Sequence, residues 1–327
     1  MTAHKVLVTS RSFSSGTRDL IHELTAAGAQ VTHGPADHAF PAIKAELASA
    51  VAWIAGTGPI TRTHLNAAPQ LRLVARYGVG TDSIDLAAAA EHGVTVTNTP
   101  GANTEAVADH ALALTLALLR NVVVADRDSR SGAWRPHPAR EVAGLRVGVA
   151  GFGRIGRAFA HRLTALGATV LAHDPNVPDD EMARNTVTPA DLSQLAHDCD
   201  VVSLHAPGET LVVDTAWLHH GHAGLLLVNT ARASLVDEQA VVTALRLGRL
   251  AGYAADDLAG GEAPAGHPLR ADDIGDRVVI TPHCAAQTVE AIDRMGATAT
   301  AAVLAVLRGH SPSNIVALAT DQTRVRQ

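Results

Sequence analysis

The sequence predicts an α/β protein in which a doubly wound parallel sheet (Rossmann-type) forms one domain and a second domain accompanies it. Short apolar runs alternate with Ala- and Leu-rich stretches of helical length along nearly all of the 327 residues. The runs are apolar at consecutive positions, which is typical of parallel strands covered by helices on both faces. One helix opens with a glycine-rich turn directly after a strand, as in dinucleotide-binding folds. The length suits about two domains.

Ten apolar runs are expected to form strands because they are short, rich in Val, Leu and Ala, and bounded by turn residues. In chain order they are 6–9, 51–55, 71–75, 94–97, 147–150, 170–173, 201–205, 225–229, 252–255 and 278–281. In the stretches between them, apolar residues recur at three- and four-residue spacing, which predicts helices. The clearest of these stretches are 18–27, 86–92, 155–166 and 238–247.

Residues 104–130 form one long helical pattern that interrupts this alternation. Gly132 and the prolines Pro136 and Pro138 end it, because proline is not tolerated inside a helix. We interpret the long helix as the seam between a first and a second α/β unit. A final helix is expected at 289–307, and the pattern leaves open which unit it packs against.

Composition and charge favour a soluble cytoplasmic protein without a nucleic-acid or membrane partner. The formal net charge of -6 offers no electrostatic attraction to either. The most apolar stretch, 106–119, contains Asp109 and His110 and is shorter than a membrane span. The first apolar run is too short for a secretion signal. The two cysteines, Cys199 and Cys284, imply no disulfide framework, which fits a reducing compartment.

The strongest local motif is Gly151-x-Gly153-x-x-Gly156, between an expected strand and an expected helix. Gly151 allows the tight turn, Gly153 lets the backbone approach a pyrophosphate, and Gly156 lets helix and strand pack closely. The N–H groups at the helix N-terminus then face the phosphates. Asp174 ends the next strand, 18 residues after Gly156, where a carboxylate accepts hydrogen bonds from ribose hydroxyls and repels a 2′-phosphate. These features predict NAD rather than NADP.

Two side chains suited to 2-oxo acid chemistry follow strands in the second half of the chain. Arg232 comes just after one strand, and its guanidinium fork can bind a carboxylate. His283 comes just after another and can give a carbonyl oxygen its proton. Asp256 ends the strand between them, and Glu262 follows in a Gly- and Pro-rich loop. Since ligands of open α/β sheets gather at the carboxyl ends of strands, we expect an active site there.

Five segments, taken in order, resemble the D-isomer-specific 2-hydroxyacid dehydrogenases, a family that includes phosphoglycerate, glycerate, formate and phosphite dehydrogenases. The segments are 76–85, 151–156, 204–207, 229–237 and 281–283. The resemblance covers nearly the whole chain. It implies an NAD-dependent oxidoreductase that transfers a hydride between NAD(H) and a small D-2-hydroxy acid or 2-oxo acid.

The resemblance also implies the domain organisation. A discontinuous, flavodoxin-like substrate domain would comprise residues 1–101 and 284–327, and the dinucleotide-binding domain residues 102–283. A homodimer would form through the helix at 104–130.

Roles for individual residues follow from the same resemblance. Arg232 anchors the substrate carboxylate, His283 is the general acid/base, and Glu262 holds and tunes His283. The residues expected to contact the substrate are Thr57, Gly58, Gly78, Val79, Arg232 and His283. The residues expected to contact NAD are Gly151, Gly153, Arg154, Ile155, Gly156, Asp174, His205, Ala206, Pro207, Thr230, Ala231, Arg232, Asp256, His283 and Thr104.

Two departures from the family pattern bear on the assigned roles and on the substrate. Relatives commonly read Asp-Val-Phe-Glu-x-Glu-Pro where this chain reads Asp-Asp-Leu-Ala-Gly-Gly-Glu-Ala-Pro at 256–264. Glu262 therefore stands one place later than usual, which we attribute to a one-residue loop insertion. No arginine stands at 57–58, where phosphoglycerate enzymes tend to bind a phosphate, although Arg62 or Arg76 could replace it.

Two alternative functions remain open. The segment 250–256 resembles the phosphite dehydrogenase branch, so a phosphite- or phosphonate-type anion, as in a phosphonopyruvate reductase, is an alternative substrate. The second alternative, of another class, is a protein that binds NAD(H) as a sensor without turnover. The presence of all three catalytic residue types, Arg, Glu and His, argues against it. No metal is expected, because His219, His220 and His222 lack an acidic or Cys partner. Cys284 is interpreted as a buried free cysteine.

Overall fold

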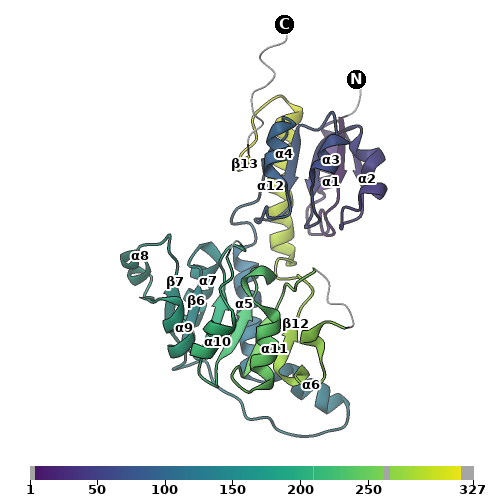
Figure 1. The fold of residues 1–327 in the computed structure, drawn as a ribbon. Coiled ribbons are helices and arrows are strands. Elements are labelled where there is room, and N and C mark those ends of the chain that lie inside the picture. The colour runs from purple at the N-terminus through teal and green to yellow at the C-terminus, as the bar shows by residue number, and fades with distance from the viewer. Residues whose placement is uncertain (1–3, 209, 261–265, 318–327) are drawn as a thin grey trace. The chain divides into compact units, whose positions relative to one another are not determined.

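The computed structural model describes residues 4–208, 210–260 and 266–317, and the chain divides into two compact units (Figure 1). Unit 1 comprises Met1–Asn103 and Gln287–Gln327, and unit 2 comprises Thr104–Ala286. The boundaries expected from the sequence, after residues 101 and 283, lie two and three residues earlier than these. Each unit has its own sheet and its own apolar core.

Unit 1 is built on a six-stranded sheet with the order β13-β5-β4-β3-β1-β2. The strands are β1 (His4–Val8), β2 (Ala29–His33), β3 (Ala50–Ala55), β4 (Leu73–Arg76), β5 (Thr95–Thr97) and β13 (Ile315–Ala317). All neighbours are parallel except β13, which is antiparallel to β5. The parallel part has the 2-1-3-4-5 order of flavodoxin-like folds.

The described residues of unit 1 form five helices, namely α1 (Leu20–Ala26), α2 (Phe40–Leu47), α3 (Arg62–Asn66), α4 (Leu86–Glu91) and α12 (Val289–Leu307). The last of them, α12, packs against β4 and α1. Gly296 permits the close approach to α1, because a Cβ there would lie 2.2 Å from the Leu20 side chain. The final helix, which the sequence pattern could not assign, therefore completes the core of unit 1.

Unit 2 is built on a seven-stranded, all-parallel sheet with the order β12-β11-β10-β9-β6-β7-β8. The strands are β6 (Arg146–Ala150), β7 (Thr169–His173), β8 (Thr188–Pro189), β9 (Val201–Leu204), β10 (Leu226–Asn229), β11 (Gly252–Ala255) and β12 (Val278–Ile280). The helices are α5 (Thr104–Leu119), α6 (Val122–Arg130), α7 (Arg154–Ala165), α8 (Asp179–Arg184), α9 (Leu192–Asp198), α10 (Thr215–His220) and α11 (Glu238–Arg246). The strand order reverses between β6 and β9, the switch point of a Rossmann-type sheet.

All ten predicted strands are present, shifted by no more than two residues at either end. Three strands were missed: β2, β8 and β13. In β2 only Ala29 is buried, β8 has two residues, and β13 is a three-residue edge strand. None of them contains the continuous apolar run that the other strands share.

The single helix predicted at 104–130 is wrong. The chain bends by 61° between α5 and α6. Asn121, in the left-handed region with φ +53°, lies at this bend, a conformation that asparagine tolerates better than most residues. No single helix in the described part of the chain is long and apolar enough to cross a membrane; α5 and α6 reach that length and composition only as a bent pair.

Aspartate side chains begin five of the helices. Each accepts a hydrogen bond from a backbone N–H in the first turn of α1, α4, α9, α10 or α11. Such a cap stabilises a helix by about 1 kcal/mol. The capping residues are Asp19, Asp85, Asp191, Asp214 and Asp237.

Candidate active site

The glycine-rich turn joins β6 to α7 at the switch point of unit 2. Gly151 has φ +97°, and a Cβ on it would lie 2.5 Å from the Ala206 backbone nitrogen. A Cβ on Gly156 would lie 2.0 Å from the Gly151 carbonyl oxygen. A Cβ on Gly153 would meet no atom within 4 Å. Packing within the protein therefore requires the first and third glycines, whereas the second leaves open space beside the helix N-terminus.

The start of α7 carries unused backbone donors. Gly153 is the N-cap and offers no side chain to the N–H groups of the first turn, which begins with Arg154 and Ile155. The Asp174 carboxylate lies against the same turn and accepts hydrogen bonds from the Phe152 N–H at 2.8 Å and the Asn176 N–H at 2.9 Å. The N–H groups at the start of α7, which could bind a pyrophosphate, thus lie next to the Asp174 carboxylate, which could accept hydrogen bonds from ribose hydroxyls.

Two buried polar atoms at strand ends of unit 2 lack partners among the described residues. They are Nδ1 of His205, after β9, and Oγ1 of Thr230, after β10. The other ring nitrogen of His205 lies 3.0 Å from the Ser203 hydroxyl. Burial lowers the pKa of His205 to about 3, so the ring is neutral. Because buried polar groups are normally satisfied, these atoms fit a polar ligand such as NAD.

Arg232 is presented by a turn that the buried Asn229 organises at the end of β10. The Asn229 amide accepts from the Ala231 N–H at 3.0 Å and donates to the Arg232 carbonyl oxygen at 2.8 Å. The Arg232 side chain then runs past Gly208, where a Cβ would come within 2.8 Å of the Arg232 Cγ. The guanidinium donates to the Ala231 carbonyl oxygen at 2.8 Å.

His283 follows β12 in the left-handed region, with φ +51°. Its N–H donates to the carbonyl oxygens of Asp256 at 2.8 Å and Thr281 at 3.0 Å. The next two N–H groups, of Cys284 and Ala285, donate to the Asp256 carboxylate at 2.9 and 2.8 Å. A non-glycine residue keeps this conformation only where surrounding contacts stabilise it. Here hydrogen bonds to Asp256 supply most of those contacts.

Asp256 is 3% exposed and is surrounded by donors. Burial would raise the pKa of its carboxyl, but hydrogen bonds from His110, Thr281 and the Cys284 and Ala285 N–H groups hold that pKa below its usual value. The ligand atoms of His110, Asp256 and Cys284 lie within 4.8 Å of one another. The hydrogen bonds to Asp256 are sufficient to explain why these three side chains lie close together. Cys284 is half-buried, less buried than expected, and burial and the Asp256 charge raise the pKa of its thiol.

The side chain of His283 is paired with a carboxylate that the sequence analysis did not single out. Nδ1 of His283 lies 3.1 Å from Oδ1 of Asp257. The other oxygen of Asp257 accepts from the Ala233 N–H at 3.0 Å, directly after Arg232. Glu262, the predicted partner of His283, lies outside the described residues. Asp257 stands where the family pattern commonly has valine. This difference was the feature of the sequence that could have identified Asp257 as a partner of His283.

The residues predicted to bind the substrate in unit 1 follow two neighbouring strands. Thr57 and Gly58 come after β3, and Gly78 and Val79 come after β4, which pairs with β3 in parallel. Gly78 has φ +140°, and a Cβ there would meet the guanidinium of Arg76 at 2.8 Å. The structure thus brings these four residues to one edge of the unit 1 sheet.

The two arginines considered for phosphate binding are already engaged. Arg76 is 7% exposed and donates to the carbonyl oxygens of Gly80, at 2.8 Å, and Tyr77. Arg62 forms an ion pair with Glu91 at the surface.

The structure also locates Thr104 and two of the histidines considered as metal ligands. Thr104, predicted to contact NAD, is the first residue of α5. Of the histidines at 219–222, His219 contacts the Arg249 guanidinium at 2.9 Å and His222 contacts the Cys199 carbonyl oxygen at 2.9 Å.

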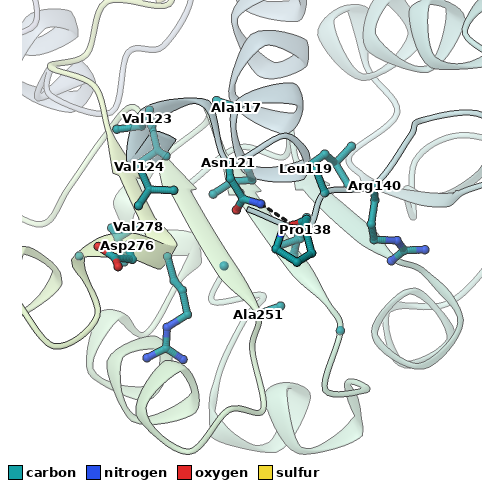
Figure 2. Close-up of a pocket in the computed structure, with 18 residues that line it drawn as sticks. Ala117, Leu119, Asn121, Val123, Val124, Pro138, Arg140, Ala251, Asp276 and Val278 are labelled. Atoms are coloured by element: carbon teal, nitrogen blue, oxygen red, sulfur yellow. Dashed lines mark hydrogen bonds between the residues drawn. The ribbon is translucent and has the colours of Figure 1, made fainter. Parts of the chain in front are cut away.

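Unit 2 contains a cavity of about 250 Å³ whose lining includes neither Arg232 nor His283. Figure 2 shows residues that line it. Its lining includes Leu226, Gly252 and Val278, the first residues of β10, β11 and β12. Arg232 and His283 follow the opposite, carboxyl ends of β10 and β12. The cavity lies beside the α5–α6 bend, where the Asn121 amide donates to the Pro138 carbonyl oxygen at 2.7 Å.

Comparison with known proteins gives consistent matches over this architecture. The family model described as D-isomer specific 2-hydroxyacid dehydrogenase, NAD binding domain, matches residues 112–285. A glyoxylate reductase of Korarchaeum cryptofilum is 38% identical over 269 residues, covering 80% of each chain. A D-3-phosphoglycerate dehydrogenase of Mycobacterium leprae is 39% identical over 250 residues, covering 75% of this chain and 47% of that protein.

A solved structure agrees over both units. The NAD-dependent formate dehydrogenase from Staphylococcus aureus, in complex with NAD, has a TM-score of 0.85 at 28% identity, covering 97% of this chain and 100% of that one. The matched family model spans the glycine-rich turn, the Arg232 turn and His283, and so covers the residues described above in unit 2.

Proposed function

Because the chain belongs to the D-isomer-specific 2-hydroxyacid dehydrogenases, NAD-dependent enzymes that act on CH–OH donors, we propose that it interconverts a small, unphosphorylated 2-oxo acid and its D-2-hydroxy acid. One observation carries this proposal. The Asp257 carboxylate contacts both the Ala233 N–H in the Arg232 turn and the His283 imidazole. The backbone next to Arg232 and the His283 imidazole are thereby joined through one side chain at the carboxyl ends of β10 and β12.

In reduction, the proposed roles follow from the chemistry of the two side chains. The Arg232 guanidinium binds the substrate carboxylate and polarises the adjacent carbonyl. His283 donates a proton from Nε2 to the carbonyl oxygen as that oxygen becomes negative, and in oxidation it accepts the proton back. NADH, when bound, supplies the hydride that the carbonyl carbon receives. Glu262 remains a predicted partner of His283.

The cofactor contacts are proposed from the same unit. The turn from Gly151 to Gly156 would hold the pyrophosphate, Asp174 the ribose hydroxyls, and the buried Thr230 hydroxyl a polar group near the nicotinamide. The N–H groups of Thr57, Gly58 and Val79 in unit 1 are proposed to bind the substrate carboxylate, whereas the Gly78 N–H donates to the Arg76 carbonyl oxygen at 3.0 Å.

The substrate is proposed to lack a phosphate because Arg76 and Arg62 are engaged with backbone carbonyls and with Glu91. Among the relatives, one is named as a glyoxylate reductase and another as a D-3-phosphoglycerate dehydrogenase. The engagement of both arginines favours a compound of the glyoxylate or hydroxypyruvate type over 3-phosphohydroxypyruvate.

A substrate panel tests this function. Glyoxylate, hydroxypyruvate, pyruvate, 3-phosphohydroxypyruvate and phosphonopyruvate are offered with NADH, and phosphite with NAD, while NADH absorbance is followed. We expect the highest kcat/KM for an unphosphorylated 2-oxo acid. Turnover of phosphite or phosphonopyruvate alone would favour the phosphorus-anion alternative. Tight NADH binding without turnover of any compound would favour a sensing protein.

We also propose a soluble, cytoplasmic homodimer that forms through unit 2. In support, α6 and the loop after it expose apolar side chains: Trp134 is 91% exposed, Val122 54% and Val123 49%. These three side chains come from one short stretch of the chain, 122–134, and exposed apolar patches commonly mark an interface between proteins.

A further inference from the structure

We infer that Asp257 is a positioning residue that orients the His283 imidazole and ties it to the Arg232 turn; this inference rests on the proposed function. Asp257 directly follows Asp256 at the end of β11, which lies between β10 and β12 in the sheet. One side chain at the end of the middle strand can therefore reach the loops of both neighbours.

The contacts use both oxygens of the carboxylate. Oδ1 lies 3.1 Å from Nδ1 of His283, and the second oxygen accepts from the Ala233 N–H at 3.0 Å. The Asp257 side chain is 18% exposed and the His283 side chain 44%. The Ala233 contact is part-buried, whereas the His283 contact is exposed on the side of the imidazole. Hydrogen bonds to a charged acceptor are stronger than those between neutral groups.

Asp257 is charged, and this fixes the tautomer of His283. Burial would raise the pKa of the Asp257 carboxyl, but hydrogen bonds from His283 and Ala233, with the charges of His283 and Arg232, hold that pKa below its usual value. An ionised carboxylate only accepts hydrogen bonds, so Nδ1 must carry the proton. Nε2 has no hydrogen-bond partner among the described residues and is left for the substrate.

Asp256, the adjacent carboxylate, performs a different task. Its oxygens accept from the Thr281 hydroxyl and from the Cys284 and Ala285 N–H groups, and thus hold the backbone after His283. The two aspartates therefore divide the support of His283: Asp256 fixes its main chain and Asp257 its ring.

The groups around His283 divide between its ring and its backbone. Among the described residues, Asp257 is the carboxylate in contact with the ring. Asp256 accepts from the N–H groups that follow His283, and its carboxylate is grouped with His110 and Cys284. The hydrogen bond to Asp257 therefore keeps the proton on Nδ1 and leaves Nε2 for proton exchange with the substrate.

The test compares Asp257→Asn with Glu262→Gln and with Asp273→Asn, an exposed carboxylate of unit 2 paired with Arg246. For the wild type and each variant, kcat and KM are measured against pH in the direction of reduction, together with NADH affinity. In Asp257→Asn we expect kcat for reduction to fall, because the amide no longer imposes the Nδ1-protonated tautomer on His283. The loss should fall mainly on kcat, with NADH affinity unchanged. Asp257→Glu, which keeps the carboxylate, should restore part of kcat, and Asp273→Asn should match the wild type.

A second measurement does not depend on turnover. The ¹⁵N shifts of His283, assigned by their loss in His283→Gln, should show protonated Nδ1 in the neutral wild-type ring. In Asp257→Asn this preference should weaken, and part of the neutral rings should carry the proton on Nε2. A wild-type ring protonated at Nε2, or a fall of kcat in Glu262→Gln and not in Asp257→Asn, overturns the inference. An enzyme inactive on every 2-oxo acid refutes the proposed function, while the ¹⁵N result still decides the role of Asp257.

Discussion

Arg232 and His283 are the side chains on which the proposed chemistry depends most directly. Neither is held by a helix or a strand; each lies in a loop shortly after a strand. Asn229 closes the turn before Arg232, and Asp256 binds the backbone around His283. Buried polar side chains at strand ends therefore supply the rigidity that catalytic groups need.

Replacing either catalytic side chain should lower turnover without loss of cofactor binding. In His283→Gln and in Arg232→Gln we expect kcat/KM to fall by about 10²–10⁴-fold, the usual contribution of a positioned proton donor or charged anchor. Arg246→Gln, which removes a surface guanidinium paired with Asp273, is the matched control and should retain activity. The measurements are steady-state kinetics and NADH fluorescence titration. Wild-type turnover in either catalytic variant would contradict the assigned roles.

The glycines of the turn between β6 and α7 meet two separate requirements, packing within the protein and space for a ligand. Gly151 and Gly156 are required by contacts within the protein, and Gly153 by none of the described residues. The motif therefore has a structural part and a part that serves the ligand.

Alanine at the two positions should separate stability from cofactor affinity. Gly156→Ala places a methyl group against the Gly151 carbonyl oxygen and should destabilise unit 2 by about 1–3 kcal/mol. Gly153→Ala meets open space, so its thermal midpoint should stay near that of the wild type while NADH binding weakens. Differential scanning calorimetry and NADH titration check both. Equal losses of stability in the two variants would contradict this division.

Two sheets of different strand order organise the whole molecule, one flavodoxin-like and one Rossmann-type. The chain leaves unit 1 at Asn103 and returns to it at Gln287. The insertion of unit 2 between these two residues is the reason why unit 1 is discontinuous in the sequence.

The proposed dimer makes a prediction about the assembly as a whole. Trp134→Glu should give a monomer in sedimentation equilibrium at concentrations where the wild type is a dimer, because a charge would be buried at the interface. Leu247→Glu, at another exposed apolar position of unit 2, is the control and should remain dimeric. A monomeric wild type at every concentration would refute the proposed assembly.

Local chemistry was enough to predict the fold class, ten strands, the glycine turn, and the positions of Arg232 and His283 after strands. Apolar runs report burial on both faces of a sheet, and glycines report close backbone approach, so each can be interpreted from neighbouring residues in the chain.

Other features depended on contacts between distant parts of the chain. The pattern at 104–130 is helical throughout, yet the chain bends at Asn121 between α5 and α6. Arg76 could have served a phosphate, but the folded loop after β4 occupies its guanidinium. Asp257 became a partner of His283 because β11 lies between β10 and β12. Tertiary packing decides which strands lie side by side in a sheet, and no pattern of neighbouring residues in the sequence determines that order.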